Sequence, residues 1–348
     1  MQTLKIHGRD SDSIVLVGAR LSELEEYVCG RKQVIITDTN IARLYQKDFP
    51  SANIITLGAG EEKKNLDTVK YIYQQLLNSD TDRSTFIVGI GGGVVCDIAG
   101  FAASTFMRGL RFGFVATSLL SQVDASVGGK NGVNFAGYKN MIGVFNQPEF
   151  VICDPNLLKT LPPKEILSGL AEVIKHAAIA DARLFEFLEQ NFEKVLQLDT
   201  AAVERLVYDS VVIKSKIVNQ DEREQGERKK LNFGHTFGHA IEKMTAVSHG
   251  EAISVGMAIA AELSVKCNLL STADYKRIRN LLANFKLPIH LKLDRKMLVS
   301  NFKKDKKRAG EMIHFILLNG VGNAVVEKIS IQRLTELVND LNYFSDSL

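Results

Sequence analysis

The sequence lacks the features that mark membrane, secreted and nucleic-acid-binding proteins. No apolar run is long enough to cross a bilayer, and the first ten residues, MQTLKIHGRD, contain no signal-peptide core. The cysteines form no C-x-x-C pair, which favours free thiols in a reducing compartment (Cys29, Cys96, Cys153 and Cys267). The formal net charge of +3 argues against a dedicated nucleic-acid binder. We therefore expect a cytoplasmic protein with neither a membrane nor a nucleic acid as a partner.

Internal repeats and low-complexity segments are also missing. The 45% hydrophobic and 24% charged content is that of an ordinary globular protein. A chain of 348 residues is long for a single hydrophobic core, so two domains are expected.

The first part of the chain alternates strand and helix patterns. The segments TLKIHG and SIVLVGA flank a polar turn and predict a hairpin. Four short β-branched or aromatic runs predict further strands: QVIITD, NIITLG, TFIVGIGGG and RFGFVATS. Amphipathic stretches such as NLDTVKYIYQQLLNS lie between them. Alternating strands and helices predict a parallel sheet that is covered on both faces.

The pattern changes after VICDPNLLKTLPP. Pro162 and Pro163 stand where a helix would begin. Helical periods follow in KEILSGLAEVIKHAAIA, TAAVERLVYDSVVIKSKIVNQ, LNFGHTFGHAIE and GEAISVGMAIAAELSVKCNLL, the last rich in the small residues of closely packed helices. Only EMIHFILL and AVVEKIS resemble strands. We predict an α/β domain over residues 1–155 and a mainly helical domain over residues 156–348.

The glycine loop GIGGGVVCD, residues 89–97, leaves a predicted strand and enters a predicted helix. Glycines let a backbone approach a phosphate closely, and a helix N-terminus offers unpaired N–H donors. The spacing is not G-x-G-x-x-G, because Val94 occupies the place of the last glycine. By itself the loop fits a tight strand–helix turn about as well as a phosphate site.

Two other strand ends favour a dinucleotide site. Asp38 ends the run QVIITD and is followed by Asn40, and the segment GEEKK after another strand contains Glu61 and Lys64. Ligands of open α/β sheets bind at the carboxyl ends of strands. We therefore prefer a dinucleotide site to three coincidental turns.

Three residues are candidate metal ligands: Glu172 in GLAEVIK, His235 in GHTFGH and His249 in SHGEA. A catalytic zinc needs three N or O ligands and one open position. The candidates lie in separate helical segments, so spacing alone does not join them. His239 and Glu242 would share a helix face with His235, as a second ligand, as catalytic groups or as ordinary polar residues.

Five cations lie in patterned segments where buried helices are expected: Lys130, Lys139, Lys175, Lys214 and Arg228. Each alone fits a solvated face. Together they suggest a pocket for a polyanion such as a phosphorylated acid. The charge run FKKDKKRAG, residues 302–310, fits a solvated loop best and a phosphate-gripping loop second.

In combination, these segments resemble the 3-dehydroquinate synthase family of sugar-phosphate cyclases, from about residue 38 to about residue 320. The motifs that carry the resemblance are GGGVVCDIAGFAAS, FMRG, SLLSQVDASVGGKNGVN, GYKNMIGVFNQP, SGLAEVIKH, DEREQGERKKLNFGHTFGHAIE and HGEA. The resemblance implies an NAD- and metal-dependent phosphate lyase of the shikimate pathway, which leads to the aromatic amino acids. Its substrate would be 3-deoxy-arabino-heptulosonate 7-phosphate. Transient oxidation, phosphate elimination, re-reduction, ring opening and aldol closure would then yield 3-dehydroquinate.

The resemblance also implies roles for single residues. Zinc, with cobalt as an alternative, would be bound by Glu172, His235 and His249, while Glu242 would orient a ligand. The NAD residues would be Asp38, Asn40, Glu61, Lys64, Gly92, Gly93, Val94, Asp97, Thr117, Ser118, Lys130 and Lys139. The substrate residues would be Asp124, Lys130, Lys139, Asn140, Lys175, Lys214, Arg228, Asn232, His239 and a lysine of DKK, taken as Lys306. Arg108 would reach the substrate phosphate of a partner subunit, which implies a homodimer.

Three other readings compete with this one. A polyol dehydrogenase would share the fold and the metal, but it has little need for the pairs Lys139–Asn140 and Arg228–Asn232. Another sugar-phosphate cyclase would be expected to change some substrate residues. A non-enzymatic NAD-sensing or scaffold protein would not need an intact ligand set.

Overall fold

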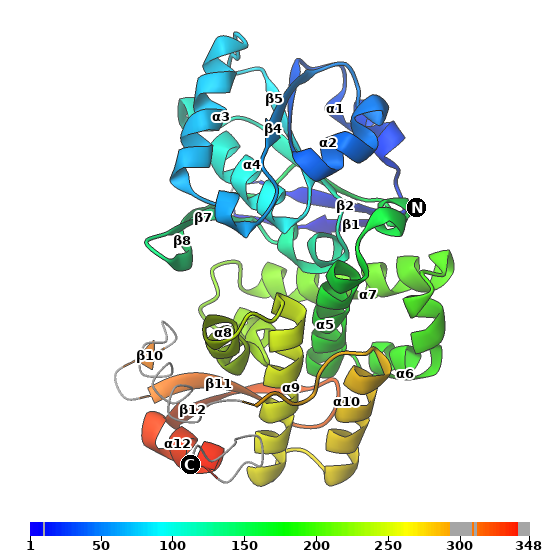
Figure 1. Ribbon diagram of the computed structural model, residues 1–348, viewed down its shortest axis with the longest axis vertical. Coiled ribbons are helices and arrows are strands. Elements are labelled where there is room, and N and C mark those ends of the chain that lie inside the picture. The colour runs from blue at the N-terminus through cyan, green and yellow to red at the C-terminus, as the bar shows by residue number, and fades with distance from the viewer. Residues whose placement is uncertain (10, 293–307, 310–311, 340–348) are drawn as a thin grey trace. The chain divides into compact units, whose positions relative to one another are not determined.

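The structure, a computed structural model, describes residues 1–9, 11–292, 308–309 and 312–339. The chain divides into two compact units (Figure 1). The first consists of Met1–Pro162 and Val203–Arg223, and the second of Pro163–Ala202 and Glu224–Leu348. The chain thus leaves the first unit after Pro162 and returns to it within helix α7 (Thr200–Gln220).

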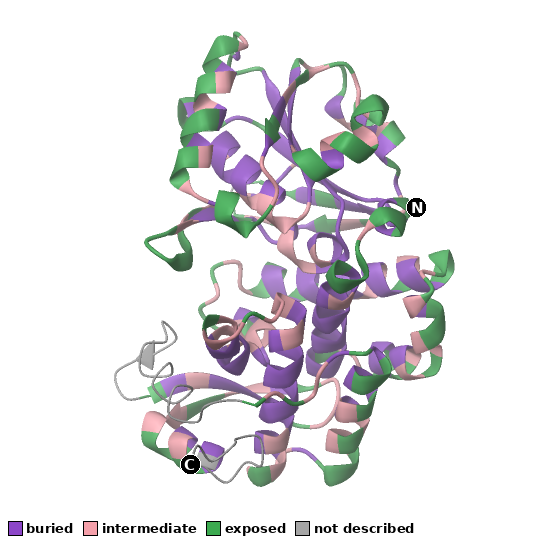
Figure 2. Cartoon of the chain, in the orientation of Figure 1, coloured by how far each residue is buried: buried purple, intermediate pink, exposed green. Residues whose placement is uncertain are grey.

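A seven-stranded sheet forms the centre of the first unit, in the order β1-β2-β9-β6-β5-β3-β4. The two N-terminal strands pair antiparallel as the predicted hairpin, and every other pair is parallel. The residues of β5 and β6 are all buried, so the sheet is covered on both faces as predicted (Figure 2). The strands are β1 (Gln2–Ile6), β2 (Ser13–Val17), β3 (Gln33–Asp38), β4 (Asn53–Leu57), β5 (Phe86–Gly91), β6 (Phe112–Ala116) and β9 (Phe150–Cys153).

The helices of the first unit follow from capping and apolar spacing. In α3 the buried residues Val69, Ile72 and Leu76 recur every three or four positions, and the Asn65 side chain accepts a hydrogen bond from the Thr68 N–H. The helical elements besides α7 are η1 (Leu21–Glu23), α1 (Leu24–Val28), α2 (Thr39–Tyr45), η2 (Gln46–Asp48), η3 (Glu61–Lys63), α3 (Leu66–Asn78), α4 (Gly93–Thr105), η4 (Phe106–Arg108), η5 (Ser121–Ala125) and η6 (Pro155–Thr160).

A two-stranded hairpin of β7 (Lys130–Phe135) and β8 (Tyr138–Phe145) corrects one prediction. Lys130 and Lys139 were expected in buried helices, but both lie exposed on this hairpin. At its tip, Ala136 and Gly137 both have positive φ, 50° and 79°, as a type I′ turn requires. The segment contains too many glycines for either a helical or an alternating period to be visible. Strand β9 was not predicted either.

The second unit is mainly helical, as predicted, with a three-stranded antiparallel sheet of order β10-β11-β12. Strands β11 (Met312–Leu318) and β12 (Ala324–Ser330) were expected, whereas the short β10 (Arg308–Ala309) was not. The helices are α5 (Pro163–Ala180), α6 (Ala182–Leu196), η7 (Glu227–Asn232), α8 (His235–Met244), α9 (His249–Lys266), α10 (Thr272–Asn284) and α12 (Ile331–Asn339).

Helices α8 and α9 approach closely through glycines. A Cβ atom on Gly256 of α9 would lie 2.1 Å from the carbonyl oxygen of Gly234, and one on Gly238 would lie 2.5 Å from Ile253 Cδ1. Gly234 has φ 77° and is the N-cap of α8, so this helix begins at His235, later than the predicted residue 231. The small residues predicted to allow close packing therefore do so here.

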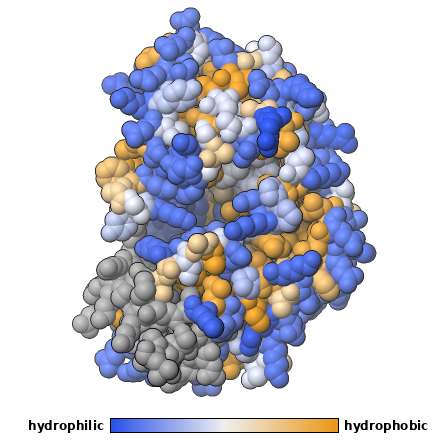
Figure 3. All heavy atoms as spheres, in the orientation of Figure 1, coloured by the Kyte–Doolittle hydropathy of each residue, from blue (hydrophilic) through white to orange (hydrophobic). Residues whose placement is uncertain are grey.

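Figure 3 shows the hydropathy of one face of the molecule. Among the residues described there, hydrophobic side chains are interspersed with hydrophilic ones. Among the residues that the structure describes, no helix is both long enough and apolar enough to cross a membrane.

Candidate active site

The glycine loop places an open helix N-terminus at the end of strand β5. Gly92 is the N-cap of α4, and no side chain caps it. A Cβ atom on Gly92 would meet only Ser118, with Oγ at 3.4 Å, and one on Gly93 would meet only Ala125 Cβ, at 3.0 Å. Space therefore remains in front of the first backbone N–H groups of α4, which is where a diphosphate would bind.

The strand order puts this helix N-terminus at a topological switch point. From β3 the chain moves to β4 on one side, and then crosses back to β5 on the other side. In doubly wound sheets, ligands bind at the carboxyl ends of the two strands where the order reverses. Those ends hold Asp38 and the glycine loop. One oxygen of Asp38, Oδ1, also caps α2 by accepting from Asn40 N at 2.8 Å and Ile41 N at 3.0 Å.

Lys64 connects a predicted NAD residue with a predicted substrate residue. Its side chain is buried and pairs with Asp97, and its Nζ donates to Asn140 Oδ1 at 2.6 Å. Burial raises the pKa of Asp97, and the charge of Lys64 opposes that shift. The resemblance assigns Lys64 to NAD and Asn140 to the substrate, and the structure places their side chains in contact.

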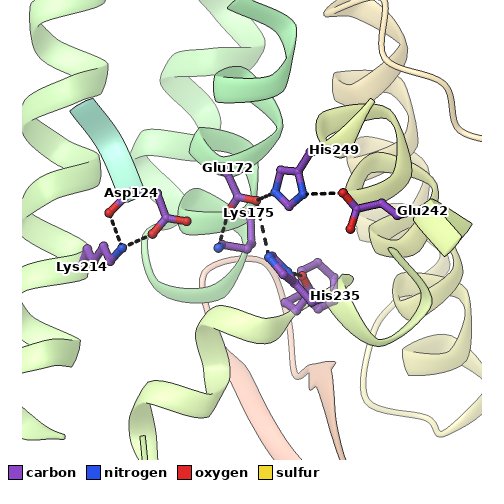
Figure 4. A network of polar contacts seen from close by, with 8 residues as sticks. Asp124, Glu172, Lys175, Lys214, His235, Glu242 and His249 are labelled. Carbon is purple, nitrogen blue, oxygen red and sulfur yellow. Dashed lines mark hydrogen bonds and ion pairs between the residues drawn. The ribbon is translucent and has the colours of Figure 1, made fainter. Parts of the chain in front are cut away.

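Two more predicted groups lie at the carboxyl end of β6 and beyond it. Thr117 N donates to Gly91 O at 2.9 Å, which aligns the end of β6 with the glycine loop. Ser118 Oγ lies 3.0 Å from Ser121 Oγ. Asp124 on η5 pairs with Lys214 of α7, which is buried (Figure 4).

Six predicted residues of the first unit are exposed: Asn40, Glu61, Arg108, Lys130, Lys139 and Asn140. Arg108 follows the C-terminal end of α4 and has φ 70°, which is uncommon for a residue other than glycine. It lies 13 residues of helix away from the glycine loop, or about 20 Å at 1.5 Å per residue. Arg108 is therefore not part of the group around Gly92.

In the second unit, Glu172, His235 and His249 come together from three helices. Glu172 is fully buried on α5, and the histidines are the first residues of α8 and α9. Glu172 Oε1 lies 3.6 Å from His235 Nε2 and 3.1 Å from His249 Nε2 (Figure 4). The three ligand atoms all lie within 4.8 Å of one another.

This donor set fits a small divalent cation. Tetrahedral zinc with bonds of about 2.0–2.2 Å to N and O ligands separates neighbouring ligand atoms by about 3.4 Å. The distances from the Glu172 oxygen to the two imidazole nitrogens lie on either side of that value. Two nitrogens and one carboxylate oxygen leave a fourth position for water or substrate, as in catalytic zinc sites.

Both histidines are oriented through their second ring nitrogen. His235 Nδ1 lies 3.1 Å from the carbonyl oxygen of Phe233, and His249 Nδ1 lies 3.1 Å from Glu242 Oε1. Glu242 thus contacts a candidate ligand, as predicted for an orienting residue.

The surroundings shift the two histidines in opposite directions. Burial and the charge of Lys175 hold the pKa of His235 well below its usual range. Burial also acts to lower the pKa of His249, but hydrogen bonds with Glu172 and Glu242 outweigh it and raise the value to about 9. Because imidazole binds a metal only when neutral, metal binding would release a proton from His249.

Two of the predicted substrate residues of the second unit, Lys175 and His239, contact this cluster. Lys175 is 1% exposed and pairs with Glu172. The ring of His239 stands edge-on to that of His235 at 5.3 Å. Arg228 is buried on η7, and Asn232 at the end of η7 donates to Glu224. Lys306 lies outside the described residues.

Two residues that form hydrogen bonds with predicted site residues were not predicted from the sequence: Glu224 and Asn134. Glu224 accepts from Asn232 and has φ 60°, and Asn134 contacts both Glu61 and Asn140. Both lie within the motifs that carry the family resemblance, but an asparagine or glutamate in such a motif gives no signal of its own role in a single sequence.

Comparison with known proteins gives consistent matches along the chain. The family profile described as 3-dehydroquinate synthase N-terminal matches residues 54–168, and the one described as 3-dehydroquinate synthase C-terminal matches residues 169–308. The 3-dehydroquinate synthase of Pelobacter propionicus is 40% identical over 346 residues, covering 95% of this chain and 96% of the relative. That of Campylobacter curvus is 44% identical over 317 residues, covering 88% and 90%.

Solved structures of two other cyclases share the fold over nearly the whole chain. A 2-deoxy-scyllo-inosose synthase complexed with carbaglucose-6-phosphate, NAD⁺ and Co²⁺ has a TM-score of 0.85 and 27% identity, covering 97% of this chain and 99% of its own. A 2-epi-5-epi-valiolone synthase from Streptomyces hygroscopicus, with NAD⁺ and Zn²⁺, has a TM-score of 0.85 and 26% identity, covering 93% and 95%. An iron-containing alcohol dehydrogenase, with a TM-score of 0.66 and 13% identity over 94% of this chain and 96% of its own, shows the fold alone.

Proposed function

The chain belongs to the 3-dehydroquinate synthase family, and from that premise we propose that it converts 3-deoxy-arabino-heptulosonate 7-phosphate into 3-dehydroquinate and inorganic phosphate. This is a carbocycle-forming step of the shikimate pathway. The observation that carries the proposal is the donor set of Glu172, His235 and His249, whose spacing suits a catalytic divalent cation. A glycine loop at a sheet switch point supports the cofactor that such a reaction needs.

NAD, when bound, would accept a hydride and later return it, so that no net oxidation occurs. The open N–H groups at the start of α4 would hold its diphosphate, and Asp38 with Asn40 would face the ribose. Lys64, kept in place by Asp97, would add a positive charge beside the cofactor. The other proposed NAD residues are Glu61, Gly92, Gly93, Val94, Thr117, Ser118, Lys130 and Lys139.

A divalent metal, zinc or cobalt, would polarise a substrate hydroxyl and lower its pKa. Glu172, His235 and His249 would hold that metal. The buried ion pair between Lys175 and Glu172 keeps an ammonium beside the ligand set, where Lys175 can place a proton at a substrate oxygen. His239, one turn along α8 from His235, is the second residue proposed to move a proton.

The remaining proposed residues bind the two anionic ends of the substrate. Buried cations keep their charges in fixed positions, so the carboxylate and phosphate would be held in one geometry during the later steps. Lys214 is held by Asp124, and Asn232 is held by Glu224, which orients both toward such a role. Arg228, Lys130, Asn140 and Lys306 complete the proposed substrate set.

The organisation of the molecule is proposed on the same basis. We infer an NAD-binding domain at residues 1–155 and a metal- and substrate-binding domain at residues 156–348. Arg108, remote from the glycine loop along α4, would complete the site of a partner subunit in a homodimer. A cytoplasmic location fits the free cysteines.

The decisive assay follows phosphate and absorbance at 340 nm together. Chelator-stripped protein is supplied with zinc, NAD⁺ and 3-deoxy-arabino-heptulosonate 7-phosphate. We expect phosphate release that depends on both zinc and NAD⁺, with no accumulation of NADH. NADH that accumulates with glycerol, without phosphate, would assign the protein to the polyol dehydrogenases. Phosphate release from another heptulose 7-phosphate or from glucose 6-phosphate alone would assign it to another cyclase.

A further inference from the structure

Asn134 lies at an irregular point of the β7–β8 hairpin. Val133 pairs with Ile142 and Phe135 pairs with Tyr138, so Asn134 alone stands against residues 139–141 of the opposite strand. Such bulges break the regular alternation of side chains and redirect them, often beside functional sites. The bulged residues include Lys139 and Asn140, both proposed site residues.

Three hydrogen bonds close a ring between Asn134, Asn140 and Lys64. Asn134 N donates to Lys64 O at 2.8 Å, and Asn140 N donates to Asn134 Oδ1 at 2.9 Å. Lys64 Nζ then donates to Asn140 Oδ1 at 2.6 Å. The ring joins the hairpin to the turn after β4, two segments about 70 residues apart in the sequence.

A fourth hydrogen bond extends this ring to Glu61. Asn134 Nδ2 donates to Glu61 Oε1 at 2.8 Å. The Asn134 side-chain amide thus uses both of its polar atoms: its oxygen accepts from the Asn140 N–H, and its nitrogen donates to Glu61. An aspartate at this position would keep the acceptor but lose the donor, and it would repel the Glu61 carboxylate.

The bond from the Asn140 N–H also holds an unusual backbone. Asn140 has φ 53°, in the left-handed region, which asparagine tolerates better than most residues. That conformation fixes the direction of the Asn140 side chain toward Lys64 Nζ. Removing the acceptor on Asn134 would release the constraint.

We propose that Asn134 is a positioning residue that locks the Glu61–Lys64 turn and the bulge at Asn140 into one arrangement. In this role Asn134 acts through its neighbours, because it fixes Glu61 and Lys64 for NAD and Asn140 for the substrate at the same time. This inference rests on the proposed function of those three residues. Its consequence is that NAD affinity depends on a residue of the hairpin.

The test measures equilibrium binding of NAD⁺ to the zinc-loaded full chain by calorimetry, without substrate. We expect Asn134→Asp to raise the Kd for NAD⁺ at least tenfold, while zinc content and the melting temperature stay close to those of the wild type. Asn53→Asp is the matched control. It adds the same negative charge at an exposed position, the amino end of β4. It should leave the Kd unchanged.

A double-mutant cycle separates positioning from general damage. In the wild type, Asn134 donates to the Glu61 carboxylate. In the double variant Glu61→Gln/Asn134→Asp, the new amide at position 61 can donate to the new carboxylate at position 134, so the hydrogen bond is restored in the opposite direction. In the Glu61→Gln background, Asn134→Asp should therefore raise the Kd less than threefold. Equal effects of Asn134→Asp in both backgrounds, or an unchanged Kd in the wild-type background, would overturn the inference. A wild-type chain that binds no NAD⁺ would instead overturn the proposed function.

Discussion

At the scale of single residues, His235 and His249 differ in the group that orients them. The Nδ1 atom of His235 faces a neutral backbone carbonyl, whereas that of His249 faces the carboxylate of Glu242. Partners of this kind fix the ring and raise the basicity of the ligating nitrogen, and their loss commonly weakens metal binding. The His249 position should therefore be the more sensitive to a single side-chain change.

The first prediction concerns Glu242. Glu242→Ala removes the group that orients His249, so the Kd for zinc should rise about 10- to 100-fold. Competition against a chromophoric chelator measures it. Glu262→Ala is a matched control, since Glu262 lies on α9 and accepts from Tyr275 at 3.1 Å, away from the three ligands. Unchanged zinc affinity in Glu242→Ala would show that this contact does not support the site.

The second prediction separates the two histidines of α8. His235→Ala should lose stoichiometric zinc after dialysis, because only two of the three proposed ligands remain. His239→Ala should keep the zinc and lose turnover, since its ring lies beside His235 without being one of the three ligand groups. Elemental analysis and the phosphate assay are run on the same samples. Equal zinc in His235→Ala and the wild type would reject the ligand assignment.

At the scale of elements, the metal ligands depend on how α8 packs against α9. Both histidines are the first residues of their helices, so the distance between the helices sets the distance between the ligands. The closest approach uses Gly234 and Gly256, where a single Cβ atom would overlap a backbone oxygen. Sequence composition predicted close packing of α9 but not its partner.

The third prediction follows from this contact. Gly256→Ala should push α8 away from α9, lower the free energy of unfolding by about 1–3 kcal/mol and weaken zinc binding about tenfold. Thermal unfolding and chelator competition measure the two effects.

Gly320→Ala serves as the control for that prediction. A Cβ atom there meets nothing within 4 Å, although φ is +85°. It should cost about 1 kcal/mol in backbone strain and leave zinc binding unchanged. If Gly256→Ala loses stability but keeps wild-type zinc affinity, the packing of α8 does not position the ligands.

At the scale of the whole molecule, Arg108 is the one proposed residue whose role requires a second copy of the chain. It is exposed, has a positive φ and lies at the opposite end of α4 from the glycine loop. A residue held in a strained conformation at the surface is a candidate for a contact that the single chain does not contain.

The fourth prediction tests this role. Arg108→Ala should raise the KM for the heptulosonate phosphate at least tenfold, and should leave NAD⁺ and zinc affinity unchanged. Arg83→Ala, at another exposed arginine of the same unit, is the control. Sedimentation should show a dimer for the wild type, and a fully active monomer would exclude the role.

Subunit exchange gives a sharper form of the same test. A mixture of Arg108→Ala and His239→Ala chains forms hybrid dimers in which one of the two sites has both residues intact. After exchange the mixture should regain about a quarter of the wild-type activity, since about half of the dimers are hybrid. Activity no higher than that of the separate variants would show that Arg108 acts within its own chain.

Local patterns predicted most of the elements. The edge hairpin of β1 and β2, the parallel strands β3 to β6 and the helices α3, α5, α7 and α9 appear where the sequence pattern predicts them, whereas α6 and α10 were not predicted. The β7–β8 hairpin did not, because its glycines and its bulge remove the alternation that marks a strand. Strand β9 was missed because it is short and inserts between β2 and β6, which only the folded sheet can show.

The sequence by itself determined the fold class, the family and the residue types of each candidate site, because these follow from local periodicity and from motifs. It did not determine which residues meet. Glu172, His235 and His249 lie on three helices, and their convergence depends on helix packing that no spacing encodes. The contacts of Glu242 with His249 and of Asn134 with Glu61 and Asn140 likewise belong to the tertiary structure alone. Side-chain contacts between distant segments are fixed by the folded backbone, so they appear only once that backbone is known.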